Sequence, residues 1–232
     1  MADVIIVGSP FFELCDNKKI FSFTSFLELE LKKFRIRSIT LAQGLTIEEV
    51  DVIYKLVSSI YPNCIFKDDY SKLCSKENVH KKKEKNILIT KLEKYSTYNF
   101  GCNCVIQCNS EFISDHVTGI HVPGFLLMEA SRQFLISALE YEGIHNYRFI
   151  LSSISSNFKK YVFPFPFQLN AIINTEGNKS QLSTTAVVDI IQNEESCASI
   201  QIDSFIVPEK IAFFNEKLSK NTLLNNFIKS KG

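Results

Sequence analysis

The stretch HVPGFLLMEASRQF, residues 121–134, contains side chains that could do chemistry. Histidine and glutamate are among the residues most often used for proton transfer, and both occur here, as His121 and Glu129. Asp115 and His116 lie a few positions earlier. The Pro-Gly pair that follows Val122 predicts that a helix begins there, because proline suits the first turn of a helix. Two of the chain's four histidines therefore lie within a span of six residues just before one helix N-terminus.

A helix N-terminus suits chemistry at a carbonyl group. Its first N–H groups have no partner inside the helix, and the helix dipole places a partial positive charge there. Such an end can hold a carbonyl oxygen or an oxyanion, and it keeps a nearby imidazole neutral. Gly124 removes a side chain at this end, so another backbone or a ligand can come close. The pattern favours reaction at a thioester or ester carbonyl.

The helix predicted over residues 123–141 carries a polar stripe. At about 100° per residue, five polar side chains fall within a stripe about 140° wide: Glu129, Arg132, Gln133, Ser137 and Glu140. Apolar side chains lie opposite: Leu127, Ala130, Phe134 and Ala138. One interpretation is that the stripe simply faces water. The other is that it lines a site close to His121.

The remaining histidines have weaker claims to a function. His80 lies in the Lys-rich segment SKENVHKKKEK without an evident partner; the segment could bind a phosphate-bearing partner but is more typical of a solvated linker. His145 follows Gly143 and is typical of a surface position. His116 could equally be a histidine at a helix start or in the core. The histidines lack a third ligand at a usual zinc spacing, so we expect neither a metal nor a cofactor.

The motif resembles that of the A-factor biosynthesis hotdog family, whose enzymes make γ-butyrolactone signal precursors. That family typically carries His-Val-Pro-Gly, an apolar run and then Glu-Ala-x-Arg-Gln. The matching residues here are His121, Val122, Pro123, Gly124, Glu129, Ala130, Arg132 and Gln133. The resemblance implies a hotdog fold, in which a long helix packs on a curved antiparallel sheet. More distantly, the motif is similar to that of the β-hydroxyacyl-carrier-protein dehydratases.

The resemblance also implies an activity, the transfer of a β-ketoacyl group from an acyl carrier protein to dihydroxyacetone phosphate. By this resemblance, Glu129 is the carboxylate of the site, and His121 or His116 is its acid–base partner. Substrate-binding roles would fall to four further residues: Asp115, Gly124, Arg132 and Gln133. Among these, Arg132 would fix the glutamate or a phosphate, Gln133 would orient it, and the Gly124 N–H would contact an oxyanion.

Other functions on the same scaffold stay open. A dehydratase or a thioesterase would use the same groups, and each of these reactions needs a general base with a pKa of about 6–7. A non-catalytic hotdog would bind an acyl ligand or a partner enzyme. We expect an acyl carrier protein or an acyl-CoA thioester as the partner. The chain shows one hotdog repeat where the founding enzymes have two, so we expect a homodimer in which Glu129 and His121 could meet from different chains.

The sequence predicts an α+β fold in four parts. Residues 1–74 form a small α/β unit, 75–86 a polar linker, 87–208 a single hotdog domain and 209–232 a helical tail. In the first part, strand signals at 3–8, 35–42 and 63–66 alternate with a helix that starts from a capping box of Thr46 and Glu49. A lone Gly8 without a Gly-rich motif argues against a nucleotide site, so this unit is expected to serve packing or partner contact.

The second half reads as a series of antiparallel strands. Alternation over 163–171 places one set of side chains on one face: Phe163, Phe165, Phe167, Leu169 and Ala171. Polar turns are predicted at 176–178 and 192–196. The Phe-rich segment 158–167 could line an acyl tunnel, and core packing explains its rings equally well.

Composition excludes several classes. Lys+Arg 26 against Asp+Glu 25 gives a formal net charge of +1, so no overall field favours nucleic acid or an anionic membrane. No stretch reaches the ~18 apolar residues of a membrane span. Seven cysteines without a secretory signal predict reduced thiols in a cytoplasmic protein. Cys102, Cys104 and Cys108 do not have zinc-site spacing and are expected to share one face of a strand.

Overall fold

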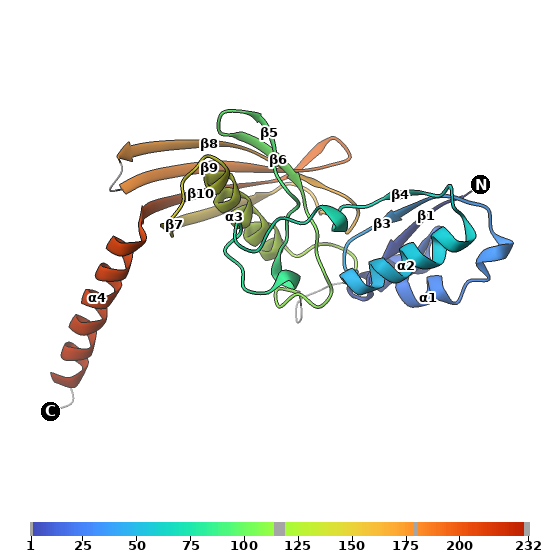
Figure 1. Ribbon diagram of the computed structural model, residues 1–232, viewed down its shortest axis with the longest axis horizontal. Helices are drawn as coiled ribbons and strands as arrows, with labels where there is room; N and C mark the ends of the chain where they lie inside the picture. The colour runs from blue at the N-terminus through green and yellow to red at the C-terminus, as the bar shows by residue number, and fades with distance from the viewer. Residues whose placement is uncertain (1, 114–118, 179–180, 230–232) are drawn as a thin grey trace.

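The computed structural model describes residues 2–113, 119–178 and 181–229. Figure 1 shows an elongated molecule with three parts: an N-terminal α/β unit at one end, a broad sheet with one long helix in the middle, and a C-terminal helix projecting from the other end. None of the described helices combines the length and the apolar character needed to cross a bilayer.

The α/β unit is built on a parallel sheet with strand order β2-β1-β3-β4. The strands are β1 (Ala2–Val7), β2 (Ile20–Ser22), β3 (Ile36–Leu41) and β4 (Ile65–Lys67). The helices are α1 (Phe23–Leu27), α2 (Ile47–Ile60) and 3₁₀ turns at Ser9–Asp16, Leu31–Lys33 and Tyr70–Lys72. The predicted capping box is present, because Thr46 accepts from the Glu49 N–H at 3.1 Å and Glu49 accepts from the Thr46 N–H at 2.9 Å.

The α/β unit interlocks with the rest of the chain at the carboxyl ends of β1 and β3. The Gln43 side-chain amide donates to the Cys104 carbonyl at 2.9 Å, and its oxygen accepts from the Ile106 N–H at 2.7 Å. A Cβ added at Gly8 would lie 1.5 Å from the Gly44 carbonyl oxygen. Open α/β sheets commonly bind ligands at these strand ends, which here are filled by the neighbouring domain.

The central domain has a long helix on a six-stranded antiparallel sheet of order β5-β6-β8-β9-β10-β7. The strands are β5 (Glu93–Ser96), β6 (Asn99–Asn103), β7 (Tyr147–Phe158), β8 (Gln168–Asn178), β9 (Gln181–Gln192) and β10 (Glu195–Pro208). The helix is α3 (Gly124–Tyr141), as predicted for 123–141. Its apolar stripe and the inner face of the sheet share one buried core, which includes Phe134, Val188 and Ile200. This is the hotdog arrangement that the sequence predicted.

Several local predictions about the strands are wrong. β8 begins only at Gln168, so Phe163 lies before it and is exposed, while Phe167 and Leu169 are buried. β8 continues through Asn178, with Gly177 still paired with Leu182, so the predicted turn at 176–178 is absent. The second turn is present as Asn193-Glu194, both with positive φ, between the paired ends of β9 and β10.

Two predictions about loops also need correction. β6 ends at Asn103, so of the three cysteines only Cys102 lies in this strand. Cys104 forms an isolated bridge with Ile89, and Cys108 lies beyond it; Cys102 and Cys104 are buried. Residues 74–88, which include the whole of the predicted solvated linker and a 3₁₀ turn at Glu84–Asn86, lie across α3; we call them the strap. Val79 anchors the strap in the main core, fully buried.

The predicted helical tail is α4 (Glu209–Lys229). It starts at the end of β10, beside the first residue of β7, because Pro208 pairs with Tyr147. Figure 1 shows that it leaves the body of the molecule at this corner of the sheet.

Candidate functional site

The polar stripe of α3 faces the strap and not water. The Gln133 oxygen accepts from the Leu88 N–H at 2.9 Å, and its amide donates to the Asn86 carbonyl at 2.9 Å. Further along the stripe, the Ser137 hydroxyl lies 3.4 Å from the Cys74 sulfur. Polar groups of the strap thus satisfy the polar groups that α3 buries, as buried polar groups require.

Glu129 lies at the centre of the contacts between the stripe and the strap. Its carboxylate accepts two hydrogen bonds from Arg132, at 2.8 and 2.9 Å, and one from the Gln133 amide at 3.1 Å. The Lys81 ammonium of the strap lies 2.5 Å from the same carboxylate and 4.7 Å from the centre of the Phe112 ring. The side chains of Glu129 and Lys81 are only 16% and 14% exposed. One carboxylate is therefore enclosed by two cations and an amide, and we call these four residues the Glu129 cluster.

The surroundings of Glu129 set its charge state. Burial on its own raises the pKa of Glu129, but hydrogen bonds from Arg132 and Lys81 outweigh it and hold the pKa below the ordinary value of 4.5. The general base with a pKa of about 6–7 that the proposed chemistry needs is therefore not Glu129 in this arrangement. The physical reason is that two cations stabilise the carboxylate form.

The N-terminal end of α3 is covered by the segment that follows β7. The His121 ring lies 4.7 Å from the Tyr161 ring, and the Val122 N–H donates to the Val162 carbonyl at 2.8 Å. A Cβ added at Gly124 would lie 2.7 Å from the Phe158 ring. Gly124 thus permits a close approach, as predicted, but an aromatic ring occupies the space.

The structure brings only some of the predicted site residues together. Arg132 and Gln133 contact Glu129 directly, whereas His121 and Gly124 lie at the start of α3 with different described neighbours. At 1.5 Å per residue, Glu129 is about 7.5 Å along the helix axis from Gly124. The predicted residues Asp115 and His116 lie outside the described residues.

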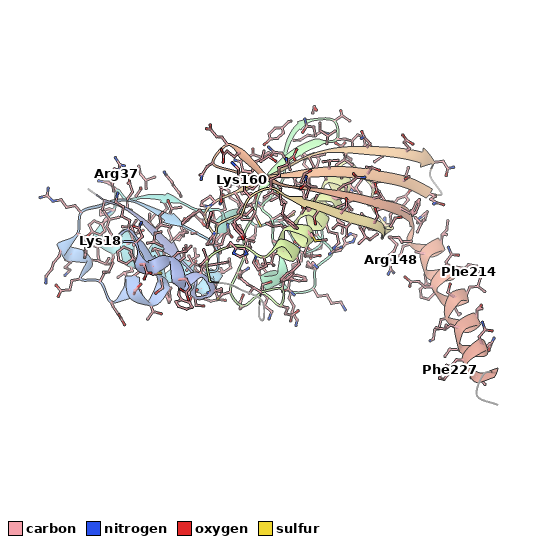
Figure 2. All side chains as sticks on the ribbon, turned by 180° about the vertical axis from the view of Figure 1, so that it is seen from behind. Lys18, Arg37, Arg148, Lys160, Phe214 and Phe227 are labelled. Atoms are coloured by element: carbon pink, nitrogen blue, oxygen red, sulfur yellow. The ribbon has the colours of Figure 1, made fainter. Side chains whose placement is uncertain are left out.

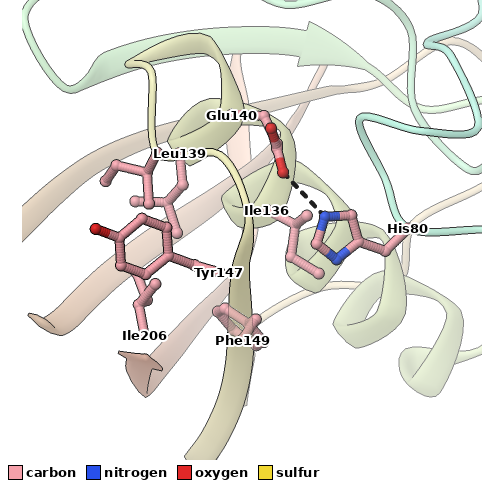
Figure 3. A pocket seen from close by; sticks show the side chains of 8 residues that line it. His80, Ile136, Leu139, Glu140, Tyr147, Phe149 and Ile206 are labelled. Atoms are coloured by element: carbon pink, nitrogen blue, oxygen red, sulfur yellow. Dashed lines mark hydrogen bonds and ion pairs between the residues drawn. The ribbon is translucent and has the colours of Figure 1, made fainter. Parts of the chain in front are cut away.

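A second group of polar side chains lies at the C-terminal end of α3. One Glu140 oxygen is 3.0 Å from a His80 nitrogen, and the other is 2.5 Å from a His145 nitrogen. Figure 3 shows the His80 contact beside a small hollow whose walls are otherwise largely apolar, including Ile136 and Phe149. His80 therefore has a partner, contrary to expectation, and it holds the strap to α3; His145 is exposed, as predicted. Among the described residues, no group of three or more His, Cys, Asp or Glu side chains is suited to hold a metal ion.

The sequence comparison agrees with the fold. Residues 66–208 match the A-factor biosynthesis hotdog domain, which is more than half of the 232-residue chain. The chain belongs to the A-factor biosynthesis hotdog domain family. The matched range includes the strap, α3 and all six strands of the antiparallel sheet. No curated protein matched the chain.

Solved structures show weaker likenesses. A phenylacetic acid degradation-related protein from Ralstonia eutropha is 10% identical, with 49% of this chain and 82% of that chain covered and a TM-score of 0.37. A mutant thioesterase from Pseudomonas aeruginosa is 8% identical, with 52% of this chain and 81% of that chain covered and a TM-score of 0.38. A mutant phenylacetic acid degradation protein from Thermus thermophilus is 14% identical, with 50% of this chain and 90% of that chain covered and a TM-score of 0.35.

Proposed function

We propose that this protein processes acyl thioesters, and that it transfers a β-ketoacyl group from an acyl carrier protein to a small hydroxylated acceptor. The observation that carries the proposal is the Glu129 cluster in a chain of this family. Glu129 lies on the long helix about one and a half turns from its N-terminus, and Lys81 reaches it from the strap. The free thiols of all seven cysteines support a reducing compartment, the cytoplasm.

In the proposed reaction, a hydroxyl oxygen of the acceptor attacks the thioester carbonyl carbon, the C–S bond breaks and the thiol leaves. The N–H groups at the start of α3 hold the oxyanion that forms on the carbonyl, once the thioester displaces the Phe158 ring that lies against Gly124. His121 takes the proton from the hydroxyl and passes it to the leaving thiolate. The low pKa of Glu129 gives it a different role from that of a base.

Glu129 in this proposal is a charged anchor. Its carboxylate holds Arg132 and Lys81 in fixed positions at the edge of the site. Both cations suit a phosphate, which pairs well with guanidinium and ammonium groups. A phosphorylated three-carbon acceptor, as the family implies, would then lie with its phosphate near Arg132 and its hydroxyl near His121.

We place the complete site between two copies of the chain. Within one chain, His121 contacts Tyr161 while Glu129 contacts the strap, so the two residues have different surroundings. Pairing of two copies would bring the start of one α3 toward the Glu129 cluster of the other. A chain with one hotdog repeat would in this way build the two-repeat arrangement of the founding enzymes.

A specific observation favours a second function. The Glu129 carboxylate is saturated by cations, and the strap lies over it, which also suits a hotdog that binds an acyl ligand or a partner without turnover.

Hydrolysis or dehydration would use the same groups, with water as the acceptor or with loss of water from a β-hydroxyacyl thioester.

A thioester panel separates these functions. β-Ketoacyl and β-hydroxyacyl thioesters of an acyl carrier protein and of coenzyme A would be incubated with the protein, with and without dihydroxyacetone phosphate. Acyl ester formation that requires the acceptor supports the transferase. Thiol release without acceptor indicates a thioesterase, an enoyl product indicates a dehydratase, and a bound acyl ligand without any product indicates a binding protein.

A further inference from the structure

The C-terminal helix α4 is exposed over most of its length. After the buried Ala212, every residue through 228 is exposed. Eight large apolar side chains on α4 are 41–71% exposed: Ile211, Phe213, Phe214, Leu218, Leu223, Leu224, Phe227 and Ile228. Figure 2 shows Phe214 near the start of this helix and Phe227 at its far end, away from the body of the molecule. The family match ends at residue 208, so α4 is an addition to the hotdog domain.

A helix of this kind needs a partner surface. Isolated helices are only marginally stable in water, and most helical stability in proteins comes from packing one face. Within the described residues, α4 is held at its root: the Glu209 N–H donates to the Asn146 carbonyl at 3.1 Å, and Arg148 lies 3.8 Å from Glu209 and 3.5 Å from Glu216. Exposed apolar surface on this scale marks an interaction site.

The neighbouring strand β7 is an open edge of the sheet. In the described chain it pairs only with β10, on one side, over its twelve residues. It exposes Ile150, Leu151 and Phe158. Long edge strands with exposed apolar side chains are templates for pairing with another strand.

We propose that α4 is an arm that packs on a second copy of this chain, whose β7 pairs antiparallel with β7 of the first copy. The position of α4 supports this partner, because its first two turns run past Arg148 of β7 and the helix projects beyond that edge (Figure 1). A second copy on β7 would therefore lie beside the arm. Two-fold symmetric pairing uses the same edge on both copies, as closed dimers do.

The proposed pairing also predicts where the arm lies. In an antiparallel pair, the first residues of one β7 are next to the last residues of the other. The root of α4 is beside Tyr147, so the arm would reach Phe158 and the exposed Tyr161 of the second copy. These two rings cover Gly124 and His121. Each arm would thus close over the start of α3 in the other copy.

The exposed area on α4 is sufficient for such a dimer. At roughly 200 Å² for a large apolar side chain, the eight exposed side chains present on the order of 900 Å². If about half of this is buried against an equal area of the second copy, two arms together bury on the order of 1,800 Å², against about 1,600 Å² for a standard interface. β7 alone presents only three such side chains.

The inference rests on the pairing of two copies proposed above and not on the chemistry of the site. Sedimentation equilibrium would compare the full chain with a chain that ends at Pro208 and with the double variant Phe214→Asp/Leu218→Asp. Ile172→Asp is the matched control, because Ile172 is 62% exposed on β8, away from β7 and α4. We expect a dimer for the full chain and the control, and a dissociation constant at least about tenfold higher for both arm variants. Equal dissociation constants for all four proteins, or a monomeric full chain, would overturn the inference.

Hydrogen exchange provides a second readout. In the full chain, amides of α4 and of residues 158–163 should exchange more slowly as the protein concentration rises. The chain that ends at Pro208 should lose this protection at 158–163. If the amides of α4 are protected when anionic lipid vesicles are added, but not when the protein concentration is raised, α4 binds a membrane surface and the inference is overturned. Turnover of thioesters by a monomeric chain would contradict both the arm and the site shared by two copies, whereas concentration-dependent protection without any turnover would support the arm while the proposed chemistry fails.

Discussion

Single residues of the Glu129 cluster explain how a carboxylate can stay charged on a buried helix face. Desolvation opposes the charge, and two cations and one amide compensate for it. Arg132 is supplied by α3 itself, three residues along, which is the spacing at which side chains on one helix meet. Lys81 comes from the strap, so the state of Glu129 depends on a segment far away in the sequence.

Replacing Lys81 with alanine should raise the pKa of Glu129, because burial would then be opposed by Arg132 alone among the cations. In the native chain the pKa of Glu129 is below its ordinary value of 4.5, so the charged carboxylate stabilises the fold at pH values above 4.5. This stabilisation is lost as the pH falls below 4.5 and through the lowered pKa. Carbon-13 NMR of labelled glutamate carboxyls would follow the titration. Lys81→Arg is the control that keeps the charge, and identical titrations in all three proteins would contradict the assigned role of Lys81.

The site motif could be predicted from the sequence, but Lys81 could not. The spacing of Glu129, Arg132 and Gln133 on a helix is a local property, and their mutual contacts follow from it. Lys81 has neighbours of the same type at 82, 83 and 85. Only the path of the strap decides which of these lysines reaches the carboxylate, and that path is a tertiary property.

At the scale of elements, the strap shows why a polar segment need not be solvated. The polar side chains that α3 buries under the strap need hydrogen-bond partners. The backbone of the strap supplies two of them to Gln133, the Leu88 N–H and the Asn86 carbonyl. The composition of the segment indicated water as its partner. Between residues 75 and 86, Val79 is the one buried apolar residue, and it gave little sequence signal.

Substituting leucine for Gln133 should destabilise the fold by about 2–4 kcal/mol, because it leaves the Leu88 N–H and the Asn86 carbonyl without partners in a buried place. Ser131→Ala is the control: Ser131 is equally buried, but its hydroxyl donates only to the Leu127 carbonyl of its own helix, at 2.8 Å. Its removal should cost less than about 1 kcal/mol. Urea unfolding measures the free energy of unfolding of both variants. Equal losses of this free energy in the two variants would show that Gln133 does not hold the strap.

The longer elements were predictable, and the shortest were not. α2 and α3 have enough turns for a helical period, and the capping box marks the start of α2. β2 has three residues and α1 has five, which is too short for either period to be recognised. The end of β8 was misjudged because Gly177 indicated a turn, whereas in the structure it stays within the paired strand.

At the scale of the whole molecule, the α/β unit and the hotdog domain share a tight joint. The main core includes Val7 and Ala42 from the α/β unit, and the core of that unit includes Val105 from the hotdog domain. The Gly44 N–H donates to the Ile106 carbonyl across this joint at 2.6 Å, and Gly8 packs on the Gly44 backbone from within the α/β unit. The sequence predicted a packing or partner role for the α/β unit as a whole, but it did not identify the backbone against which Gly8 packs.

Gly8→Ala should disrupt this joint, because a Cβ there meets the backbone of Gly44, which cannot rotate away as a side chain can. We expect a loss of at least about 3 kcal/mol or separate unfolding of the α/β unit. Gly143→Ala is the control, since Gly143 has a φ of +85° with nothing within 4 Å of an added Cβ, and should cost about 1 kcal/mol. Differential scanning calorimetry of both variants measures the change in unfolding temperature. Similar small decreases in the two variants would contradict the tight joint.

The Glu129 cluster is tested most directly by the rate of thiol release from a β-ketoacyl thioester in the presence of dihydroxyacetone phosphate. The native chain would be compared with Glu129→Gln and with Glu140→Gln, the other glutamate of the stripe, after circular dichroism shows that all three are folded. We expect Glu129→Gln to slow the reaction by about 100-fold or more, because the anchor for Arg132 and Lys81 is lost, and Glu140→Gln to stay within a few-fold of the native rate. A native rate in Glu129→Gln would contradict the assignment of the reacting site to this cluster.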